Sequence, residues 1–492
     1  MAGEARNLLF VFTDQHARRV AGCYGDPTVS TPNLDRLAAE GCAFDAAYCP
    51  SPICVPSRMS MLTARYPHRT GCWTNDDMLP ARVPTWLHGF GAGGRRPVLV
   101  GRMHAMGPDQ LHGYATRLVG EHSPNWPGVP RHDLGALVGT NDPDPRSLTA
   151  SGPGHSAYLD KDDAVVAAAL DWIEANAARE AAGKQGRPGF ALTVGLMLPH
   201  APYVADPETF ALYEGRVPPP RLGVPEDEHE FLAWWRRDRG IADPDPRDVE
   251  RARTAYWALV HRTDRLVGRL LDALERLDLL DDTLVVYASD HGDHVGERGL
   301  WWKHTFHEES VGVPLLMRLP GTIPAGTRCA NVINLADLAQ TMLEATGSPL
   351  LPQADGRSFW PLACGQPQDW EDETFSEYCT DAVPYWTGGR AVTQRMVRRG
   401  PHKLVSYDRE KPQLFDLPAD PDETHDLAGD PAHAGTRDAL LARVHDGWDH
   451  AAIAARMAQA REEKDVIAAW ARTVEPASTH VWAFDPAVNR LA

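Results

Sequence analysis

The sequence has few cysteines, no long hydrophobic run and no concentrated basic segment, and each absence excludes a class of protein. Its eight cysteines are spread over 492 residues without a CxxC pair, so neither a disulfide framework nor a zinc site is expected. The apolar run from Leu8 to Phe12 is too short for a signal-peptide core or a membrane span. The formal net charge of -18 would repel nucleic acids and anionic membranes. We therefore expect a cytoplasmic protein that binds neither.

The composition is that of a globular protein, because 43% of the residues are hydrophobic. Apolar, β-branched runs alternate with amphipathic stretches, which is typical of an α/β fold with a large, mostly parallel sheet sandwiched by helices. The expected strands are Asn7 to Thr13, Pro97 to Gly101, Gly189 to Met197, Thr283 to Ser289 and Val313 to Leu319. The expected helices are Asp160 to Ala182, Asp248 to Leu280 and a shorter one that opens at Thr31-Pro32.

The pattern changes after residue 364, and we expect two units of unequal size. Residues 1–364 would form the larger α/β domain, with 202–247 as a proline-rich excursion from its core. Residues 365–492 would form a smaller α+β subdomain with an antiparallel sheet, one closing helix over 438–463 and a tail.

Two of the expected strands end in acidic residues. The first runs into Asp14-Gln15, and the strand from Thr283 to Ser289 runs into Asp290-His291. Because the carboxyl ends of parallel strands line the ligand crevice of such a sheet, both pairs would face one cleft. Two carboxylates, an amide oxygen and an imidazole suit calcium, magnesium or manganese better than zinc. Taken singly, each acid is also explained as the cap of the helix or turn that follows.

The pentapeptide Cys54-Val55-Pro56-Ser57-Arg58 carries most of the functional information. By itself it is compatible with a buried cysteine beside a turn-forming Pro-Ser pair. It also looks like the CxPSR signature of the type I sulfatases, in which the cysteine is oxidised to formylglycine and the hydrated aldehyde is the nucleophile. The two acidic pairs favour the second interpretation.

The resemblance to the type I sulfatases extends from about residue 6 to residue 430 and depends on the order of several segments. They are Asp14-Gln15, Thr31 to Ala38, Cys54 to Arg58, Gly101 to His104, Pro199-His200, Asp290 to Gly292, Lys303 and Gln413 to Leu417. Within that superfamily, Asp14-Gln15 and the segment Met103 to Gly113 look most like the choline sulfatases and their relatives.

The resemblance implies an alkaline-phosphatase-like fold and two cofactors. One is formylglycine, made from Cys54 by a formylglycine-generating enzyme. The other is one divalent cation, calcium in the first place, with manganese and magnesium as alternatives. The implied metal ligands are Asp14, Gln15, the residue made from Cys54, Asp290 and His291.

The resemblance also assigns catalytic roles. Arg58 would stabilise developing negative charge, and His104 would take a proton from the hydrate. Lys303 and His200 would bind the sulfate and protonate the leaving alcohol. These residues, with Cys54, are the catalytic set that the sequence predicts.

Four further residues are expected to contact the substrate: Asn75, Arg102, Tyr385 and Trp386. The family commonly has lysine where this chain has Arg102. A guanidinium keeps the positive charge and gains donors, but it cannot act as a proton donor in catalysis. Tyr385 and Trp386 would belong to the pocket for the leaving group.

The sequence therefore predicts a hydrolase of small sulfate monoesters, similar to choline sulfatases, and leaves two alternatives open. A phosphonate monoester or phosphodiester hydrolase of the same superfamily would use the same nucleophile and metal ligands. A non-catalytic metal-binding protein would keep the ligands while Cys54 stays a thiol. The identity of the alcohol and a homo-oligomeric assembly also stay open.

Overall fold

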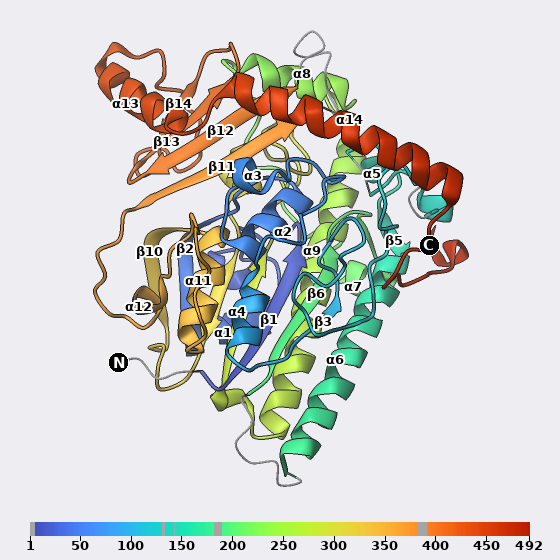
Figure 1. Ribbon diagram of the computed structural model, residues 1–492. Helices are drawn as coiled ribbons and strands as arrows, with labels where there is room; N and C mark the ends of the chain where they lie inside the picture. Colours follow the sequence, from blue (N-terminus) through green and yellow to red (C-terminus); the bar gives the residue numbers. More distant parts are fainter. Residues whose placement is uncertain (1–4, 130–132, 142, 182–188, 382–390) are drawn as a thin grey trace.

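The computed structural model describes residues 5–129, 133–141, 143–181, 189–381 and 391–492, and an eight-stranded sheet lies at the centre of this described part (Figure 1). Neighbouring strands are parallel except at β9, which pairs antiparallel with β2 and β8. In spatial order the strands are β10 (Thr327–Asn334), β2 (Cys42–Tyr48), β9 (Leu315–Arg318), β8 (Thr283–Ser289), β1 (Asn7–Asp14), β6 (Ala191–Pro199), β3 (Pro97–Gly101) and β4 (Thr116–Leu118). The mostly parallel α/β fold expected from the sequence is confirmed.

Helices cover both faces of this sheet, and the side chains of β1 show why. Leu9 and Val11 pack into one buried cluster, whereas Leu8 and Phe10 pack into another on the opposite face. This alternation is that of a strand buried on both sides. The helices of the first face are α1 (Pro32–Glu40), α6 (Ala157–Ala181) and α9 (Pro246–Arg276), and those of the second are α2 (Cys54–Thr63), α4 (Trp86–Ala92) and α11 (Leu335–Ala345).

The sequence analysis missed the two strands at one edge of the sheet, β2 and β10. A charged residue interrupts the apolar pattern of each, Asp45 in β2 and Arg328 in β10. In the structure these two side chains form a salt bridge with each other across the neighbouring strands. Their pairing is a long-range contact that no local pattern reveals.

The C-terminal part contains a second, antiparallel sheet, as expected. Its strands are β11 (Glu373–Thr380), β12 (Val392–Arg399), β13 (His402–Tyr407) and β14 (Gln413–Asp416). The single closing helix over 438–463 is wrong. Two helices, α13 (Ala434–His445) and α14 (His450–Val474), replace it, because Gly447 has a left-handed φ of 68° and Asp449 caps the second helix. The division at residue 364 stays a prediction.

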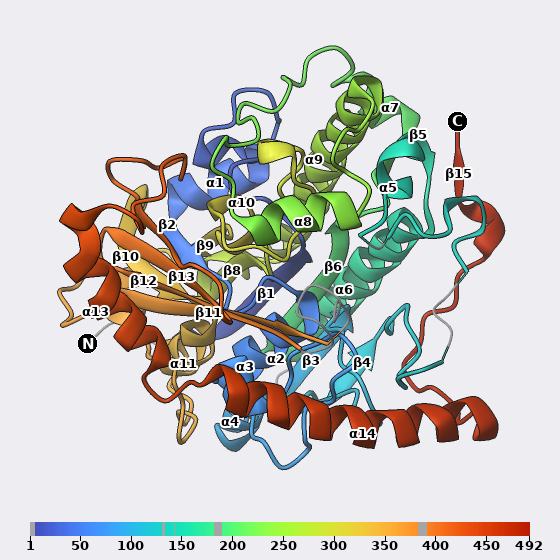
Figure 2. The same ribbon diagram turned by 90° about the horizontal axis from the view of Figure 1, so that it is seen from above.

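The excursion at 202–247 carries short helices of its own, including α8 (Glu230–Asp238), which borders the functional site. Figure 1 shows α14 and the C-terminal sheet at the end of the molecule toward which β1 points, and Figure 2 shows α8 and α14 on opposite sides of that end. The remaining elements are α3 (Pro67–Thr70), α5 (Arg146–Thr149), β5 (Gly152–His155), β7 (Val204–Ala205), α7 (Pro207–Ala211), α10 (Glu308–Val311), α12 (Trp360–Ala363) and β15 (Arg490–Leu491).

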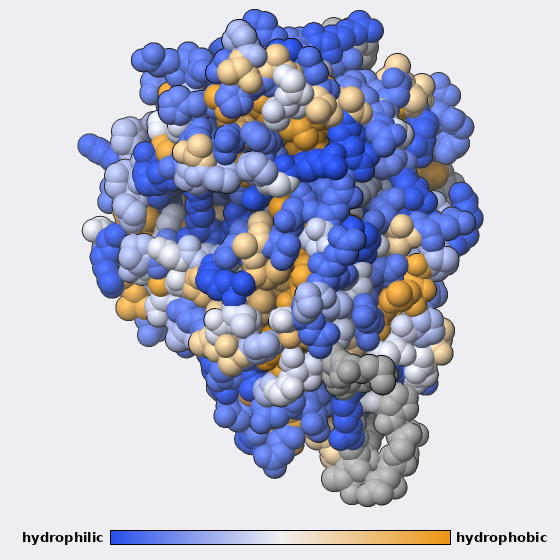
Figure 3. Space-filling view, turned by 90° about the vertical axis from the view of Figure 1, so that its left-hand side faces the viewer, coloured by the Kyte–Doolittle hydropathy of each residue, from blue (hydrophilic) through white to orange (hydrophobic). Residues whose placement is uncertain are grey.

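The surface agrees with the acidic composition. Hydrophilic residues cover most of the face shown in Figure 3, and the hydrophobic residues on it lie in separate groups. Within the described part of the chain, no helix combines the length and the apolar character needed to span a membrane.

Candidate active site

A cavity of about 240 Å³ lies at the carboxyl ends of the central strands, and its lining comes from distant parts of the sequence, from Gln15 to Phe484. Most of the residues predicted to act on a substrate line this cavity. They are Cys54, Asn75, Arg102, His104, His200 and Lys303. Arg58, Asp14, Asp290 and His291 are fully buried directly behind Cys54. Tyr385 and Trp386 lie outside the described residues.

Cys54 is the first residue of α2, and the preceding Ile53 is extended, so the helix starts abruptly at the cavity. Every residue of this helix is buried. The Oδ1 atom of Asn75 accepts a hydrogen bond of 2.9 Å from the backbone N–H of Val55 and thereby holds the first turn. A helix N-terminus concentrates N–H donors and positive potential, so it favours an anionic nucleophile and an anionic ligand here.

Asp14, Cys54, Asp290 and His291 each offer one ligand atom, and these atoms all lie within 4.8 Å of one another. The Nδ1 atom of His291 donates to the carbonyl of Gly292 at 3.0 Å, which leaves the lone pair of Nε2 directed at this cluster. Nε2 is 3.6 Å from Oδ1 of Asp290 and 3.8 Å from Oδ1 of Asp14. Lone pairs that converge in a buried site fit a divalent cation with oxygen and nitrogen ligands.

Gln15 is held so that its amide oxygen faces the same region. Its backbone is left-handed, with φ of 66°. Its Nε2 atom donates to Asp293 at 2.7 Å, which leaves Oε1 to accept from Nζ of Lys303, also at 2.7 Å. Asp293 also accepts from the hydroxyl of Tyr203 at 2.7 Å. The sequence analysis missed Asp293, although it lies only three residues after Asp290.

Arg58 connects the two carboxylates of the cluster. Its Nε donates to Asp290 at 2.8 Å and its Nη2 to Asp14 at 3.1 Å. Burial alone would raise the pKa of Asp14, but Arg102, His200, Arg58 and Lys303 together hold it well below its usual range. The Nη1 atom of Arg58 has no hydrogen-bond partner among the residues that the structure describes. A buried donor of this kind needs an acceptor, which an oxygen atom bound beside Cys54 would supply.

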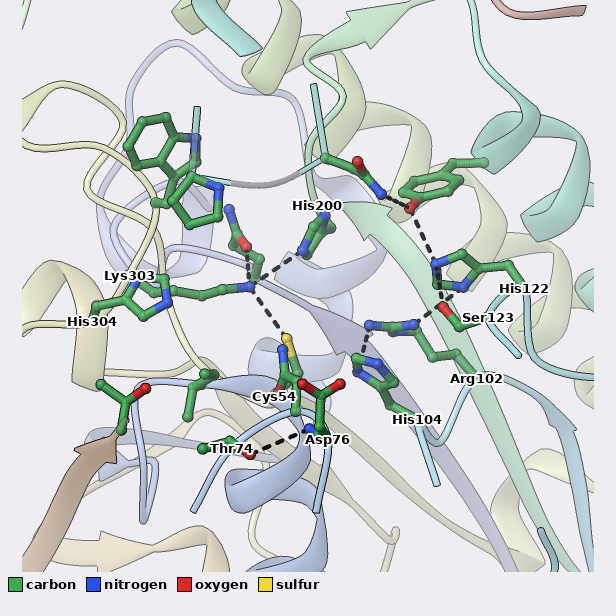
Figure 4. Close-up of a pocket in the computed structure, with 18 of the residues that line it drawn as sticks. Cys54, Thr74, Asp76, Arg102, His104, His122, Ser123, His200, Lys303 and His304 are labelled. Carbon is green, nitrogen blue, oxygen red and sulfur yellow. Dashed lines mark hydrogen bonds between the residues drawn. The ribbon is translucent and has the colours of Figure 1, made fainter. Parts of the chain in front are cut away.

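Lys303 reaches directly to Cys54 (Figure 4). Its Nζ atom is 3.2 Å from the thiol sulfur and 3.2 Å from Nε2 of His200. Nδ1 of His200 donates to the carbonyl of Ala201 at 2.6 Å, so Nε2 of His200 is the acceptor for the Lys303 ammonium. Burial and Asp14 act to raise the pKa of the Cys54 thiol, but Lys303 and His200 outweigh them and the net direction is downward.

Arg102 and His104 form the opposite side of the site (Figure 4). Nη2 of Arg102 donates to Nδ1 of His104 at 2.8 Å, so the neutral ring carries its proton on Nε2. Burial and the Arg102 charge hold the pKa of His104 well below its usual range. Neutral His104 therefore presents an N–H donor, rather than the proton acceptor that the resemblance implies. The accepting role stays a prediction.

The sequence analysis missed Glu121, a fully buried carboxylate behind this pair. Glu121 accepts from the backbone N–H of His104 at 2.6 Å and lies 3.4 Å from Nη1 of Arg102. It also pairs with Arg117 and Lys161, both fully buried. The segment around Glu121 has neither a motif nor a clear periodicity, so nothing local identifies it. Its position depends on contacts between distant segments.

The sequence matches two models of known protein families. A model described as Sulfatase matches residues 6–348. A second model, described as N-sulphoglucosamine sulphohydrolase, C-terminal, matches residues 296–448.

Full-length relatives agree with these matches. The choline-sulfatase of Rhizobium meliloti (strain 1021) is 32% identical over 479 residues, covering 92% of this chain and 90% of that protein. Arylsulfatase K of Homo sapiens is 27% identical over 455 residues, covering 87% and 80%. Among solved structures, the phosphonate monoester hydrolase SpPMH from Silicibacter pomeroyi has a TM-score of 0.73 at 25% identity, covering 89% of this chain and 94% of that one.

Proposed function

Since this chain belongs to the sulfatase family, we propose that it hydrolyses the sulfate monoester of a small organic alcohol or phenol. One observation carries the proposal: the Cys54 thiol lies between a buried cluster of metal-ligand type and the Lys303 ammonium, 3.2 Å away. A helix N-terminus, one unpaired Arg58 donor and the nearby Arg102 surround it with positive potential. Such a site suits an anionic ester and an anionic nucleophile.

Two groups would complete the site. Formylglycine made from Cys54 by a formylglycine-generating enzyme would supply the hydrated aldehyde as nucleophile. A divalent cation, calcium by our preference, held by Asp14, Gln15, Asp290 and His291, would supply positive charge beside it. In the structure Oε1 of Gln15 accepts a hydrogen bond from Lys303, whose Nζ atom also lies 3.2 Å from the sulfur of Cys54.

The chain's own residues bind and orient the ester in this proposal. Arg58 and Lys303 donate hydrogen bonds to sulfate oxygens, and Arg102 fixes the ring of His104 so that its Nε2–H points into the cavity. Lys303 and His200 are 3.2 Å apart, and in this proposal the pair donates a proton to the leaving oxygen. An alkoxide is a poor leaving group at neutral pH, so this proton transfer would raise the rate of ester cleavage.

A second candidate function is hydrolysis of a phosphonate monoester. The similarity to the phosphonate monoester hydrolase SpPMH over 89% of this chain favours it. Both esters carry one negative charge on the transferred group, so the charge of the site does not separate them. Sulfate stays the first choice because the choline-sulfatase relative is more similar in sequence, at 32% identity.

The test combines mass spectrometry with activity. Protein made with and without a formylglycine-generating enzyme is digested, and the peptide containing Cys54 is weighed. Aryl sulfate and aryl phosphonate hydrolysis are measured on the same samples. We expect a loss of about 18 daltons at Cys54 that tracks sulfatase activity, and no activity in Cys54→Ala.

The matched control is Cys23→Ser, which removes a partly buried thiol away from the cavity and should leave activity intact. Preference for the phosphonate would establish the second candidate instead. An unmodified thiol in both preparations, with ester hydrolysis at background in the wild type and in Cys54→Ala alike, would end the formylglycine mechanism and leave the non-catalytic metal-binding protein.

A further inference from the structure

We propose that Arg239 forms a second anion-binding subsite in the cavity, so that the preferred ester carries a carboxylate, phosphate or further sulfate group on its alcohol part. This inference rests on the proposed function and specifies its substrate class. Arg239 follows α8 directly as its C-cap and lines the same cavity as Cys54. Neither motif nor periodicity in the sequence singles it out.

Arg239 is fixed on the side of the cavity next to Lys303. Its guanidinium carbon lies 4.6 Å from the ring centre of Trp235, which is only 2% exposed. The Trp235 ring is in turn 4.9 Å from the ring of His304, the residue after Lys303. Together with burial, the charges of Lys303 and Arg239 hold the pKa of His304 well below its usual range, so both cations act on one neutral ring. Stacking on a buried indole restricts the guanidinium and prepares it to bind a ligand.

The hydrogen-bonding capacity of Arg239 is largely unused. A carboxylate oxygen of Asp238 lies 3.2 Å from its Nε, but this Nε has no hydrogen-bond partner within the described residues. Arg236, one turn earlier, is instead paired with Glu228 through two of its nitrogens. The Arg239 side chain is 25% exposed. Its terminal nitrogens can therefore form the two parallel hydrogen bonds that a carboxylate or phosphate accepts.

The charge balance of the cavity also favours a second anion. Its lining includes the cations Arg102, Lys303 and Arg239 but, among the described residues, Asp76 as the one carboxylate. Arg102 is already paired with Asp14, and Lys303 would bind the sulfate being cleaved. A monoanionic ester with an uncharged alcohol would leave Arg239 with the Asp238 carboxylate beside its Nε and no anion at its terminal nitrogens.

Two other acids that could receive a cationic alcohol are engaged elsewhere. Glu377 pairs with His68 at 2.6 Å and with Arg395 at 3.5 Å. Asp381 pairs with Arg461 at 2.9 Å. A quaternary ammonium would therefore meet Arg239 in a cavity whose described lining holds Asp76 as its one carboxylate. The geometry favours an anionic leaving group over a cationic one.

The experiment compares two esters of similar shape, 4-carboxyphenyl sulfate and its neutral amide, 4-carbamoylphenyl sulfate, on the mature enzyme. Phenyl sulfate and choline sulfate are the reference substrates. The wild type should prefer the carboxylate over the amide by about 10- to 100-fold in kcat/KM, mostly through KM. Arg239→Gln should remove most of this ratio and should lower phenyl sulfate hydrolysis far less than 4-carboxyphenyl sulfate hydrolysis. Comparing the ratio between variants cancels any intrinsic difference between the two leaving groups.

Three variants sharpen the result. Arg239→Lys should keep part of the preference, and Arg239→Glu should reverse it in favour of choline sulfate. Arg237→Gln, an exposed residue on the same helix outside the cavity lining, is the matched control and should change nothing. No carboxylate preference in the wild type, or an equal fall on all four esters in Arg239→Gln, would overturn the subsite. If the wild type cleaves phenyl sulfate, the proposed function survives that failure; if it cleaves none of the sulfates, both fail.

Discussion

Around Cys54 the charged side chains are fully buried and bonded to one another, whereas on the α8 side of the cavity Arg239 is 25% exposed with much of its hydrogen-bonding capacity unused. Arg58 joins the carboxylates of Asp14 and Asp290, and Arg102 adds a second bond to Asp14. Arg239 rests on an aromatic ring instead. The charged groups around Cys54 hold one another in place without a substrate, whereas Arg239 has the Asp238 carboxylate beside its Nε and keeps donors that a ligand could engage.

We infer from this difference that the buried network around Cys54 carries out the reaction and that the α8 side of the cavity selects the substrate. Groups that stabilise developing charge must be oriented before the substrate binds, and a dense network of buried ion pairs achieves that. Groups that select a substrate must keep free donors, since a donor that is already satisfied discriminates against nothing. We therefore expect substitutions around Cys54 to abolish cleavage of every ester, and substitutions near α8 to alter the ranking of esters.

The largest effect should come from Asp14→Asn, which breaks the network around Cys54. Asp14 is fully buried, and its Oδ2 atom accepts from both Arg58 and Arg102. Removing its charge takes one of two carboxylate partners from each buried cation, because Arg58 keeps Asp290 and Arg102 keeps Glu121, at a cost of about 3–5 kcal/mol in the free energy of unfolding. We also expect kcat/KM to fall by at least about 10³-fold on all sulfate esters, because Asp14 is a proposed ligand of the cation.

Kinetics, thermal unfolding and calcium titration by calorimetry measure these effects together. Asp272→Asn, an exposed position on α9, is the matched control and should be silent. Retained calcium affinity with a small loss of activity would show that Asp14 supports the fold without binding the cation.

The next largest effect should come from Glu121→Gln, which tests whether buried ion pairs that do not line the cavity also support activity. Glu121→Gln keeps the shape of the side chain but brings an amide donor among the donors of Arg102, Arg117 and His104. We expect a loss of about 3 kcal/mol in unfolding free energy and a fall of about 10- to 100-fold in kcat/KM. Chemical denaturation and kinetics on phenyl sulfate measure both.

The carboxylate-to-amide ratio should stay unchanged in Glu121→Gln, because Arg239 lies on the other side of the cavity. Glu214→Gln, an exposed substitution, controls for the amide itself. A change in the ratio would mean that the two sides of the cavity are coupled.

Glu121 and Asp14 also differ in whether the sequence alone could predict their place in the site. Asp14 and Asp290 could be predicted, because each follows a long apolar strand and strand ends converge in a parallel sheet. Cys54 could be predicted from its pentapeptide. Glu121 and Arg239 could not, because each acquires its role from segments distant in sequence.

The same limit applies to the fold. The buried strands β1 and β8 were expected from unbroken apolar runs. The strands β2 and β10 were missed because a charged residue, Asp45 or Arg328, interrupts the apolar pattern of each. The closing helix was predicted as one because the apolar spacing continues across Gly447, where the left-handed backbone interrupts it. Tyr385 and Trp386 lie outside the described residues, so their predicted contact with the substrate stays a prediction.

A smaller effect should follow from Arg102→Gln, which tests the charge next to His104. Burial and the Arg102 charge hold the pKa of His104 well below its usual range, so the ring stays neutral over the physiological range. Removing the positive charge makes protonation easier and raises this pKa. The acid limb of the pH profile of kcat/KM should therefore move to higher pH, with a fall of about tenfold at neutral pH.

Arg102→Lys keeps the charge and should shift the limb less, which makes it the matched control. A limb that stays in place in Arg102→Gln, or moves to lower pH, would mean that the neutral form of His104 does not govern activity.

The smallest effect should appear where α14 supports the rim of the cavity. Nζ of Lys464 is 2.8 Å from Asp77, whose other carboxylate oxygen accepts from the backbone N–H groups of Trp73 and Thr74. Thr74 and Asp76 line the cavity, so this ion pair holds a segment of the cavity wall. Lys464→Met keeps a long unbranched side chain at this position and removes its positive charge. We expect a rise of about two- to fivefold in KM, an unchanged kcat on phenyl sulfate, and a loss of about 1 kcal/mol in the free energy of unfolding.

The control is Arg437→Met, in an exposed ion pair on α13, which should change neither KM nor stability. If kcat falls instead of KM rising, the rim orients the reacting groups themselves, and the separation between the buried network and the selective side of the cavity no longer holds.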